Sequence, residues 1–355
     1  MNSFKINKKK IGLSHPTYFI ADIAANHDGS LRRAKKLIKL CALAGADAAK
    51  FQHFKAETIV SDYGFKKMKK LTHQKKWKKS IFQVYKEASI NPNWNMELKK
   101  TCNKYKIDFL TSPYDLKYVN DVNKYISAYK IGSGDITWIK IIEKIAKQKK
   151  PVILATGASH MSDVERAVNA IKKINKNLVL MQCNTNYTGN KNNLNYLNLN
   201  VLNSFKSRFK NKVILGLSDH TFGHISVLAA IAMGARVIEK HFTDNNLRKG
   251  PDHYFSMNPK TWKEMVNESR KLENMLGDGK KKIEYNETKS IIVQRRSIRA
   301  KINISKNTLI KENMLINLRP ITKNGIPPYK INKIINKRAK LNIKCQEEIT
   351  WKKII

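Results

Sequence analysis

The sequence predicts an α/β fold in which eight parallel strands alternate with helices and close into a (β/α)8 barrel. Two observations lead to this prediction. Short apolar runs of strand length recur along most of the chain, and segments with the helical spacing of apolar residues separate them. Alternation of this kind is typical of parallel sheets covered by helices, and it excludes all-α and all-β folds.

Eight runs have the length and apolar content of strands. They are residues 18–25, 47–54, 107–112, 126–133, 151–157, 178–184, 213–219 and 235–242. Helices are expected between them, for example at 31–45, 161–174 and 224–234, and several end at glycine, as a helix C-cap often does. The connection at 57–77 is long for a βα loop, so it is either a lid, a partner-contact segment or a solvated insertion.

Length and composition limit the class of protein. A chain of 355 residues with 41% hydrophobic content can form one large domain and a smaller one. The four cysteines show no C-x-x-C spacing, which predicts neither disulfides nor a cysteine zinc site and favours a reducing, cytoplasmic setting. No apolar run reaches membrane-spanning length, so no membrane association is expected.

The charge is strongly positive: 69 Lys and Arg against 27 Asp and Glu give a net charge of +42. Such an excess suggests nucleic acid as a partner. However, the lysines are spread along the whole chain, and the sequence has neither an aromatic RNA-binding signature nor a zinc-finger pattern. We therefore expect a solvated basic surface and no nucleic-acid partner, with a field that attracts small anionic substrates.

Candidate site residues close the apolar runs, because the active site of a (β/α)8 barrel forms at the carboxyl ends of its strands. Lys50 and Lys130 lie inside such runs, where an ammonium is costly without an anionic partner. They predict a bound phosphate or carboxylate, with a structural salt bridge as the alternative. The other strand-end residues include Asp22, Gln52, Ser112, Ser133, Asp135, Thr185, Tyr187, Ser218, Asp219, His220, Glu239 and His241.

Two histidines end neighbouring predicted strands. His220 closes "LGLSDH" and His241 closes "RVIEKH", so their imidazoles could reach one divalent ion. The alternative is a pair of hydrogen-bonded structural histidines. The pattern alone predicts a metal-assisted barrel enzyme that binds an anion.

Several stretches resemble, in order, motifs of the N-acetylneuraminate (sialic acid) synthase family, and they cover most of residues 18–275. They are "IADIAANHDGSLRRAKKLI", "AGADAAKFQHFKAETIV", "YKIGSGDITW", "KPVILATGAS", "LGLSDHT" with "GARVIEKHFT", and "GPDHYFSM". The tail, with "RRSIRA", "LRP" and "NGIPP", resembles the small SAF (antifreeze-like) domain of these enzymes. The resemblance divides the chain into a barrel at 1–275, a linker at 276–289 and a β-rich SAF domain at 290–355, with strand-like pieces at 318–320 and 324–328.

The resemblance implies a reaction between phosphoenolpyruvate and the aldehyde of an N-acetylated amino sugar, giving a nonulosonic 2-keto acid and phosphate. It implies that His220 and His241 bind a divalent metal, Mn²⁺ or in its place Mg²⁺ or Co²⁺, and that Asp22 and Asp135 are catalytic. It also implies a domain-swapped homodimer. The phosphoenolpyruvate-binding positions would be Lys50, Ser112, Lys130, Ser133, Thr185 and Ser218. The sugar-binding positions would be Gln52, Tyr187, Asp252 and Arg319.

The chain departs from the family pattern at two carboxylates. Asp22 and Asp135 stand where glutamate is usual, which shortens the reach by roughly 1.5 Å. "QCNTNYTG" also lacks the usual Tyr-Pro. The acceptor therefore stays open between N-acetylmannosamine, a phosphorylated form and a deoxy-diacetamido relative. The alternatives to this activity are another 3-deoxy-aldulosonate synthase, a metal-dependent aldolase, and a non-catalytic binding protein.

Overall fold

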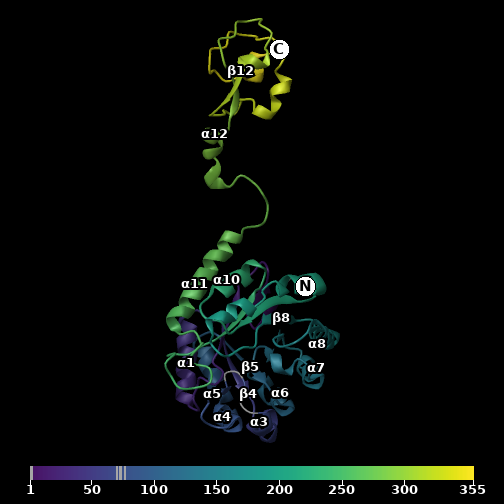
Figure 1. Ribbon diagram of the computed structural model, residues 1–355, viewed down its shortest axis with the longest axis vertical. Helices are drawn as coiled ribbons and strands as arrows, with labels where there is room; N and C mark the ends of the chain where they lie inside the picture. Colours follow the sequence, from purple (N-terminus) through teal and green to yellow (C-terminus); the bar gives the residue numbers. More distant parts are fainter. Residues whose placement is uncertain (1–2, 69–70, 72–73, 76) are drawn as a thin grey trace. The chain divides into compact units, whose positions relative to one another are not determined.

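The computed structural model describes residues 3–68, 71, 74–75 and 77–355. Residues 1–2 of the predicted first domain, and 69–70, 72–73 and 76 of the predicted long connection, lie outside the described residues. The described chain forms two compact units, one ending at Gly277 and the other beginning at Asp278 (Figure 1). No helix among the described residues is long and apolar enough to cross a membrane.

Eight parallel strands of the first unit form a closed barrel, which confirms the predicted fold class. The barrel closes where β10 pairs with β3, and the other strands follow in chain order. The strands are β3 (Tyr18–Asp22), β4 (Ala48–His53), β5 (Asp108–Pro113), β6 (Tyr129–Ile131), β7 (Val152–Ala155), β8 (Leu178–Cys183), β9 (Ile214–Asp219) and β10 (Val237–His241).

Helices cover the outside of the barrel (Figure 1). They are α1 (Leu31–Leu43), α2 (Ala56–Ile59), α3 (Asp62–Met68), α4 (Ile81–Ala88), α5 (Asn95–Lys104), α6 (Leu116–Asn123), α7 (Ile139–Lys147), α8 (Met161–Ile174), α9 (Val201–Phe209), α10 (Ile225–Ala232) and α11 (Pro259–Leu276). Short 3₁₀ turns lie at Pro92–Trp94, Ser133–Asp135, Lys191–Tyr196 and Lys210–Lys212. The apolar faces of the α-helices pack against outward strand residues such as Phe19 and Phe51.

Side chains that point into the barrel change from apolar to polar along each strand. Successive residues of a strand face opposite sides, so Val237, Glu239 and His241 of β10 share the inner face. The same is true of Ala48 and Lys50 in β4. The apolar members belong to one interior cluster near the amino ends of the strands. The polar members therefore gather at the carboxyl ends.

A hairpin that the sequence gave no reason to expect packs against the amino ends of the strands. Its strands are β1 (Ser3–Ile6) and β2 (Lys9–Gly12), paired antiparallel. Ile6 and Ile11 are buried in the interior cluster. The side chain of Asn7 at the turn donates a hydrogen bond to the buried carboxylate of Asp108, at 2.9 Å. The hairpin thus closes this end of the barrel.

Strand boundaries are tighter than predicted, mainly because turns begin earlier. The run predicted at 18–25 ends at Asp22, since Ala24 adopts a positive φ of 42°, and the run predicted at 126–133 keeps only Tyr129–Ile131. The predicted helix at 161–174 coincides with α8. The long connection predicted at 57–77 contains most of α2 and all of α3, so it is largely helical over its described residues.

The second unit has a small apolar core and little regular structure. It contains α12 (Ser290–Gln294), an antiparallel pair formed by β11 (Ser297–Ala300) and β12 (Leu315–Leu318), and 3₁₀ turns at Tyr285–Glu287, Glu312–Met314, Pro328–Lys333 and Trp351–Lys353. The strand predicted at 318–320 keeps only Leu318, the last residue of β12, and the strand predicted at 324–328 is absent apart from an isolated bridge between Gly325 and Thr350. Prolines in both stretches lack the N–H that a strand ladder needs.

Substitution of Trp262 tests the packing of α11 against the barrel. This side chain is fully buried and packs edge-on against Phe242, with ring centroids 5.6 Å apart. We expect Trp262→Ala to lower the free energy of unfolding by about 3–5 kcal/mol, because it leaves a large cavity. Urea unfolding followed by circular dichroism measures the change. The exposed neighbour Lys263 provides the control, since Lys263→Ala should leave the midpoint unchanged; equal midpoints for both variants would contradict this packing.

Candidate active site

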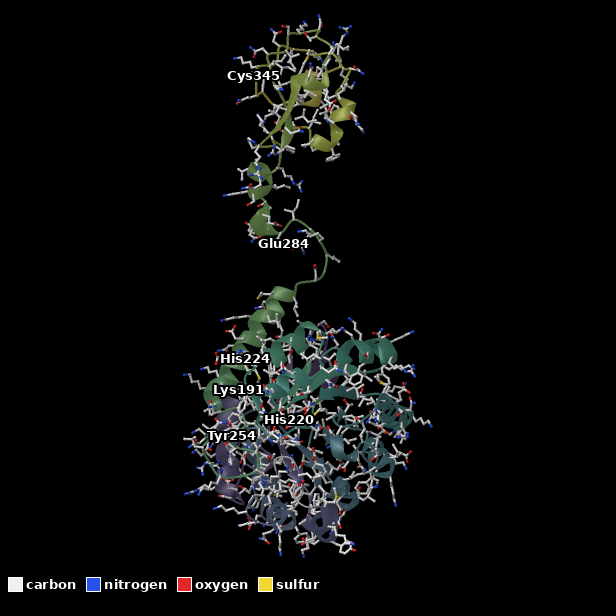
Figure 2. All side chains as sticks on the ribbon, in the orientation of Figure 1. Lys191, His220, His224, Tyr254, Glu284 and Cys345 are labelled. Atoms are coloured by element: carbon white, nitrogen blue, oxygen red, sulfur yellow. The ribbon has the colours of Figure 1, made fainter. Side chains whose placement is uncertain are left out.

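Most of the predicted site residues meet at the carboxyl end of the barrel. Strand register explains why: Asp22 lies beside Lys50 on one side and His241 on the other. Ser218 lies beside Glu239, and Gln52 beside Ser112. Residues far apart in the chain are therefore lateral neighbours in the sheet. His220, labelled in Figure 2, follows β9 and lies inside the same unit.

Two lysines and two carboxylates form a buried charge cluster. Lys50 Nζ lies 2.7 Å from Asp22 Oδ2 and 3.7 Å from Glu239 Oε2. Lys130 Nζ lies 3.1 Å from Glu239 Oε1, which also accepts a hydrogen bond from Ser218 Oγ at 2.9 Å. The salt bridges that the sequence left as an alternative for the two lysines are thus present. The formal charges of the four ionised groups cancel.

These contacts fix the charge states of the cluster. Burial opposes ionisation of Glu239, but the ammonium groups of Lys130 and Lys50 outweigh it and lower its pKa to about 2. Burial also opposes the charge of Lys50, yet Asp22 and Glu239 raise its pKa above the usual range. For Asp22, burial raises the pKa despite Lys50. Glu239 is therefore a firmly ionised anchor between two cations.

The two histidines lie together beside this cluster. Their ring centroids are 5.4 Å apart. His220 Nδ1 lies 3.0 Å from the carbonyl oxygen of Asn184 and donates to it, because a carbonyl can only accept. Burial opposes protonation of this ring, but the neighbouring Cys183 outweighs burial and raises the pKa of His220. His241 Nε2 lies 3.6 Å from Asp22 Oδ2, and its Nδ1 lies 3.9 Å from Asp252 Oδ2. Tyr187 packs against both rings.

His220 and His241 could hold a divalent ion, although the protein offers few further ligands. Burial, with His220 and nearby lysines, lowers the pKa of His241 well below its usual value, so its imidazole is neutral and able to ligate. Its Nδ1 is buried without a hydrogen-bond partner among the described residues. The described residues contain no group of three or more His, Cys, Asp or Glu placed to hold a metal. Substrate oxygens and water would therefore supply the remaining ligands.

A cavity of about 410 Å³ opens at this end of the barrel. One side is polar and includes predicted site residues; the other is an apolar wall from the segment that follows β4. The polar lining residues are Gln52, Tyr114, Asp135, Thr185, Tyr187, His241 and Asp252. The apolar wall consists of Phe54, Ile59, Trp77, Val84, Tyr85 and Ala88, the last three from α4.

Two aspartates in the cavity wall have pKa values raised toward neutral pH. Burial raises the pKa of Asp135, on the 3₁₀ turn after β6, to about 6. Burial and the nearby carboxylate of Asp22 raise the pKa of Asp252 to about 6. Both can exchange a proton near physiological pH, as a general acid or base must.

The predicted hydroxyl ligands differ in their freedom. Ser112 Oγ is buried and has no hydrogen-bond partner among the described residues, so it is available to a ligand. Ser133 Oγ accepts the Gly157 N–H at 2.9 Å. A Cβ on Gly157 would lie 1.8 Å from Thr185 Oγ1, so only glycine lets these turns approach. Ser133 and Thr185 therefore lie close together.

Arg319 lies exposed in the second unit, directly after β12. Glu239 was found at a strand end but given no role, although its spacing of two from His241 places both on the inner face. Asp219, in contrast, pairs with Lys240 at 2.6 Å and with Ser226 of α10, so it is structural.

Comparisons with known proteins agree with this geometry. A model of the NeuB family matches residues 37–281. An N,N'-diacetyllegionaminic acid synthase from Campylobacter jejuni is 38% identical over 94% of this chain and 98% of that protein. The protein of the same name from Legionella pneumophila is 33% identical over 99% of this chain and 98% of its own length.

A solved structure extends the agreement to three dimensions. The N-acetylneuraminic acid (sialic acid) synthetase from Leptospira borgpetersenii, in complex with citrate, matches with a TM-score of 0.71 and 30% identity, over 82% of this chain and 95% of that one. The family model, the full-length relatives and the closed barrel with its polar end all lead to the same assignment. The chain belongs to the NeuB family.

Proposed function

We propose that the protein joins phosphoenolpyruvate to the open-chain aldehyde of an N-acylated amino sugar, forming a nonulosonic 2-keto acid and releasing phosphate. The observation that carries the proposal is the juxtaposition of two buried ammonium groups and two imidazoles, with Asp22 in contact with both Lys50 and His241. The names of the relatives, synthases of legionaminic and neuraminic acids, support the same class of reaction.

Phosphoenolpyruvate would bind on the lysine side of the cluster. Lys50 and Lys130 offer two cations, and Ser112, Ser133, Thr185 and Ser218 offer hydroxyls, which suit a ligand with a carboxylate and a phosphate. Because Asp22 and Glu239 already balance the two lysines, the anion must displace one carboxylate from its lysine or arrive with a compensating cation. We take the second alternative, so the proposal includes a bound cation in the site.

His220 and His241 would hold that cation, Mn²⁺ or in its place Mg²⁺ or Co²⁺. Such an ion, when bound, supplies a Lewis acid for the aldehyde oxygen of the sugar. The chain prepares the position by keeping His241 neutral and by fixing the His220 ring through its hydrogen bond to Asn184.

Asp135 would act as the base, and Asp22 would position its neighbours. Once the new C–C bond has formed, the former enol carbon is electrophilic and takes up water, whose proton needs a base. Asp135, with its pKa raised by burial, suits that base. Asp22 is held between Lys50 and His241 and would orient both.

The acceptor side of the cavity favours an unphosphorylated, deoxygenated sugar. Gln52, Tyr187 and Asp252 would bind its polar groups, and Phe54, Ile59 and Val84 face it with apolar surface suited to acetamido methyl groups and to the terminal methyl group of a deoxy sugar. A sugar phosphate would require a Lys or Arg near its phosphate group, and none is found among the described residues that line the cavity. We therefore propose a diacetamido-trideoxy sugar, which the legionaminic acid synthases named above support.

The second unit would act as a SAF-type closing domain. We propose that it covers the barrel of a partner chain in a homodimer and presents Arg319 to the acceptor. Arg319 is exposed and follows β12 directly, so its guanidinium is free to meet a ligand outside its own unit.

Phosphate release tests the proposed reaction and its acceptor. With phosphoenolpyruvate and Mn²⁺, we expect the diacetamido-trideoxy sugar to give the fastest release, N-acetylmannosamine slower release, and N-acetylmannosamine 6-phosphate the slowest, because the described wall offers no cation to its phosphate. A chelator should stop turnover and added Mn²⁺ should restore it. Turnover that survives chelation would refute the metal, and preference for the phosphorylated sugar would refute the acceptor.

The pH dependence tests Asp135. Since its raised pKa is about 6, the carboxyl is protonated below that pH and ionised above it, so kcat/KM should rise through about pH 6 if it acts as a base. Asp135→Asn should lower kcat by about 10²-fold or more. Asp135→Glu should keep part of the activity with a shifted acid limb. Asp121→Asn, at an exposed aspartate, is the matched control; full activity of Asp135→Asn would exclude the role.

Arg319→Ala, made in the full chain, tests the role of the second unit. The variant should raise the KM of the acceptor about ten-fold, as loss of a hydrogen bond to a charged group does, and leave the KM of phosphoenolpyruvate unchanged. Lys323→Ala, at an exposed cation nearby, should have no effect. An unchanged acceptor KM in Arg319→Ala would remove this residue from the site.

A further inference from the structure

The loop between β10 and α11 carries Asp252 into the cavity and buries the next residue, His253, on its other side. The His253 side chain is fully buried. Its Nδ1 lies 2.7 Å from Thr243 Oγ1, near the start of the same loop, and its Nε2 lies 2.9 Å from Asp28 Oδ1, in the loop after β3. One imidazole therefore ties the two ends of this loop to the loop after β3.

The chemistry of the partners sets the direction of these hydrogen bonds. An ionised carboxylate can only accept, so His253 donates through Nε2–H to Asp28. Its Nδ1 is paired with the Thr243 hydroxyl. Asp28 is itself held by Arg33, whose Nε lies 3.0 Å from Asp28 Oδ2. Arg33 also binds Asp244 through both terminal nitrogens, at 3.1 and 2.7 Å. The imidazole is thus fixed at both nitrogens to a braced support.

A glycine in the same loop leaves room for this ring. A Cβ added to Gly250 would lie 2.6 Å from His253 Cδ2 and 3.1 Å from His253 Nε2, closer than side chains pack. Gly250 is exposed and does not have a left-handed backbone, so conformation alone does not require glycine there. The close approach of the imidazole is the physical reason for it.

The same loop fixes the carboxylate of Asp252. Asp252 Oδ2 accepts the Ala25 N–H at 3.3 Å, from the loop that also carries Asp28. Its backbone carbonyl accepts from Ser256 Oγ at 2.5 Å, and Ser256 in turn accepts from Asn26 Nδ2 at 3.0 Å. The distance from Asp252 to His241 is therefore set by how the loop after β10 is clamped to the loop after β3.

We propose that His253 is a positioning residue for the acceptor: the Asp28–His253–Thr243 chain clamps the two loops so that Asp252 is placed beside His241 in the cavity wall. The proposal rests on the proposed function, since Asp252 is taken to bind the sugar. His253 does not line the cavity and acts only through Asp252. Loosening the clamp moves the acceptor site and leaves the lysine side of the cluster intact.

Steady-state kinetics of full-length variants test the clamp, with phosphoenolpyruvate varied against N-acetylmannosamine and against the diacetamido-trideoxy sugar. We expect His253→Phe and Gly250→Ala to raise the acceptor KM about ten-fold or more, because small misplacements at a site are costly, with the KM of phosphoenolpyruvate within about two-fold of the parent. His253→Gln, which retains a donor for Asp28, should recover part of the loss. Lys249→Ala, at the exposed neighbour of Gly250, is the matched control.

The outcomes separate failure of the clamp from failure of the function. An unchanged acceptor KM in His253→Phe and Gly250→Ala would overturn the clamp while the parent still turns over. Parallel rises in both KM values would also overturn it, since they indicate general loosening. If His253→Phe does not fold, as thermal unfolding would show, Gly250→Ala and His253→Gln decide. A parent chain that releases no phosphate with either sugar would instead contradict the proposed function.

Discussion

Two lysines can stay charged inside the barrel only because two carboxylates lie within reach of them. Burial alone would favour the neutral amine, and the contacts with Asp22 and Glu239 reverse that preference at Lys50. The rest of the site is arranged around this balance. His241 stays neutral beside the cations, Asp252 and Asp135 hold protons more tightly than free aspartates, and any anion that enters must disturb the cluster.

The shorter carboxylates fit within this arrangement. Asp22 lies in register with Lys50 and His241, its two neighbours in the sheet, so a side chain with a single methylene group reaches both. One of its oxygens also accepts the Ala24 N–H at 3.1 Å, where the backbone turns out of the strand. The strand end itself, rather than side-chain length, brings this carboxylate into contact with its partners.

Alternation along the strands made the barrel and most of its polar end predictable. Lys50 and Lys130 stood out because an ammonium in an apolar run needs an explanation, and the spacing in "VIEKH" places Glu239 with His241. Partners could not be predicted in the same way, because the pairing of Asp22 with Lys50 depends on register between strands. The apolar wall from α2 and α4 left no clear pattern, since these helices are short. In the second unit, the prolines at 320, 327 and 328 argue against the strands predicted at 318–320 and 324–328, and β12 ends at Leu318.

The hairpin formed by β1 and β2 has a consequence for traffic through the molecule. Ile6 and Ile11 fill the amino end of the barrel, and Asn7 attaches the hairpin to Asp108 by a hydrogen bond. Because the hairpin closes the amino end, we expect substrates, released phosphate and product to enter and leave through the cavity at the carboxyl end. A segment that covers this entrance controls both the entry of substrates and the release of product. A cover that slows the loss of a reactive intermediate therefore also slows the release of the 2-keto acid.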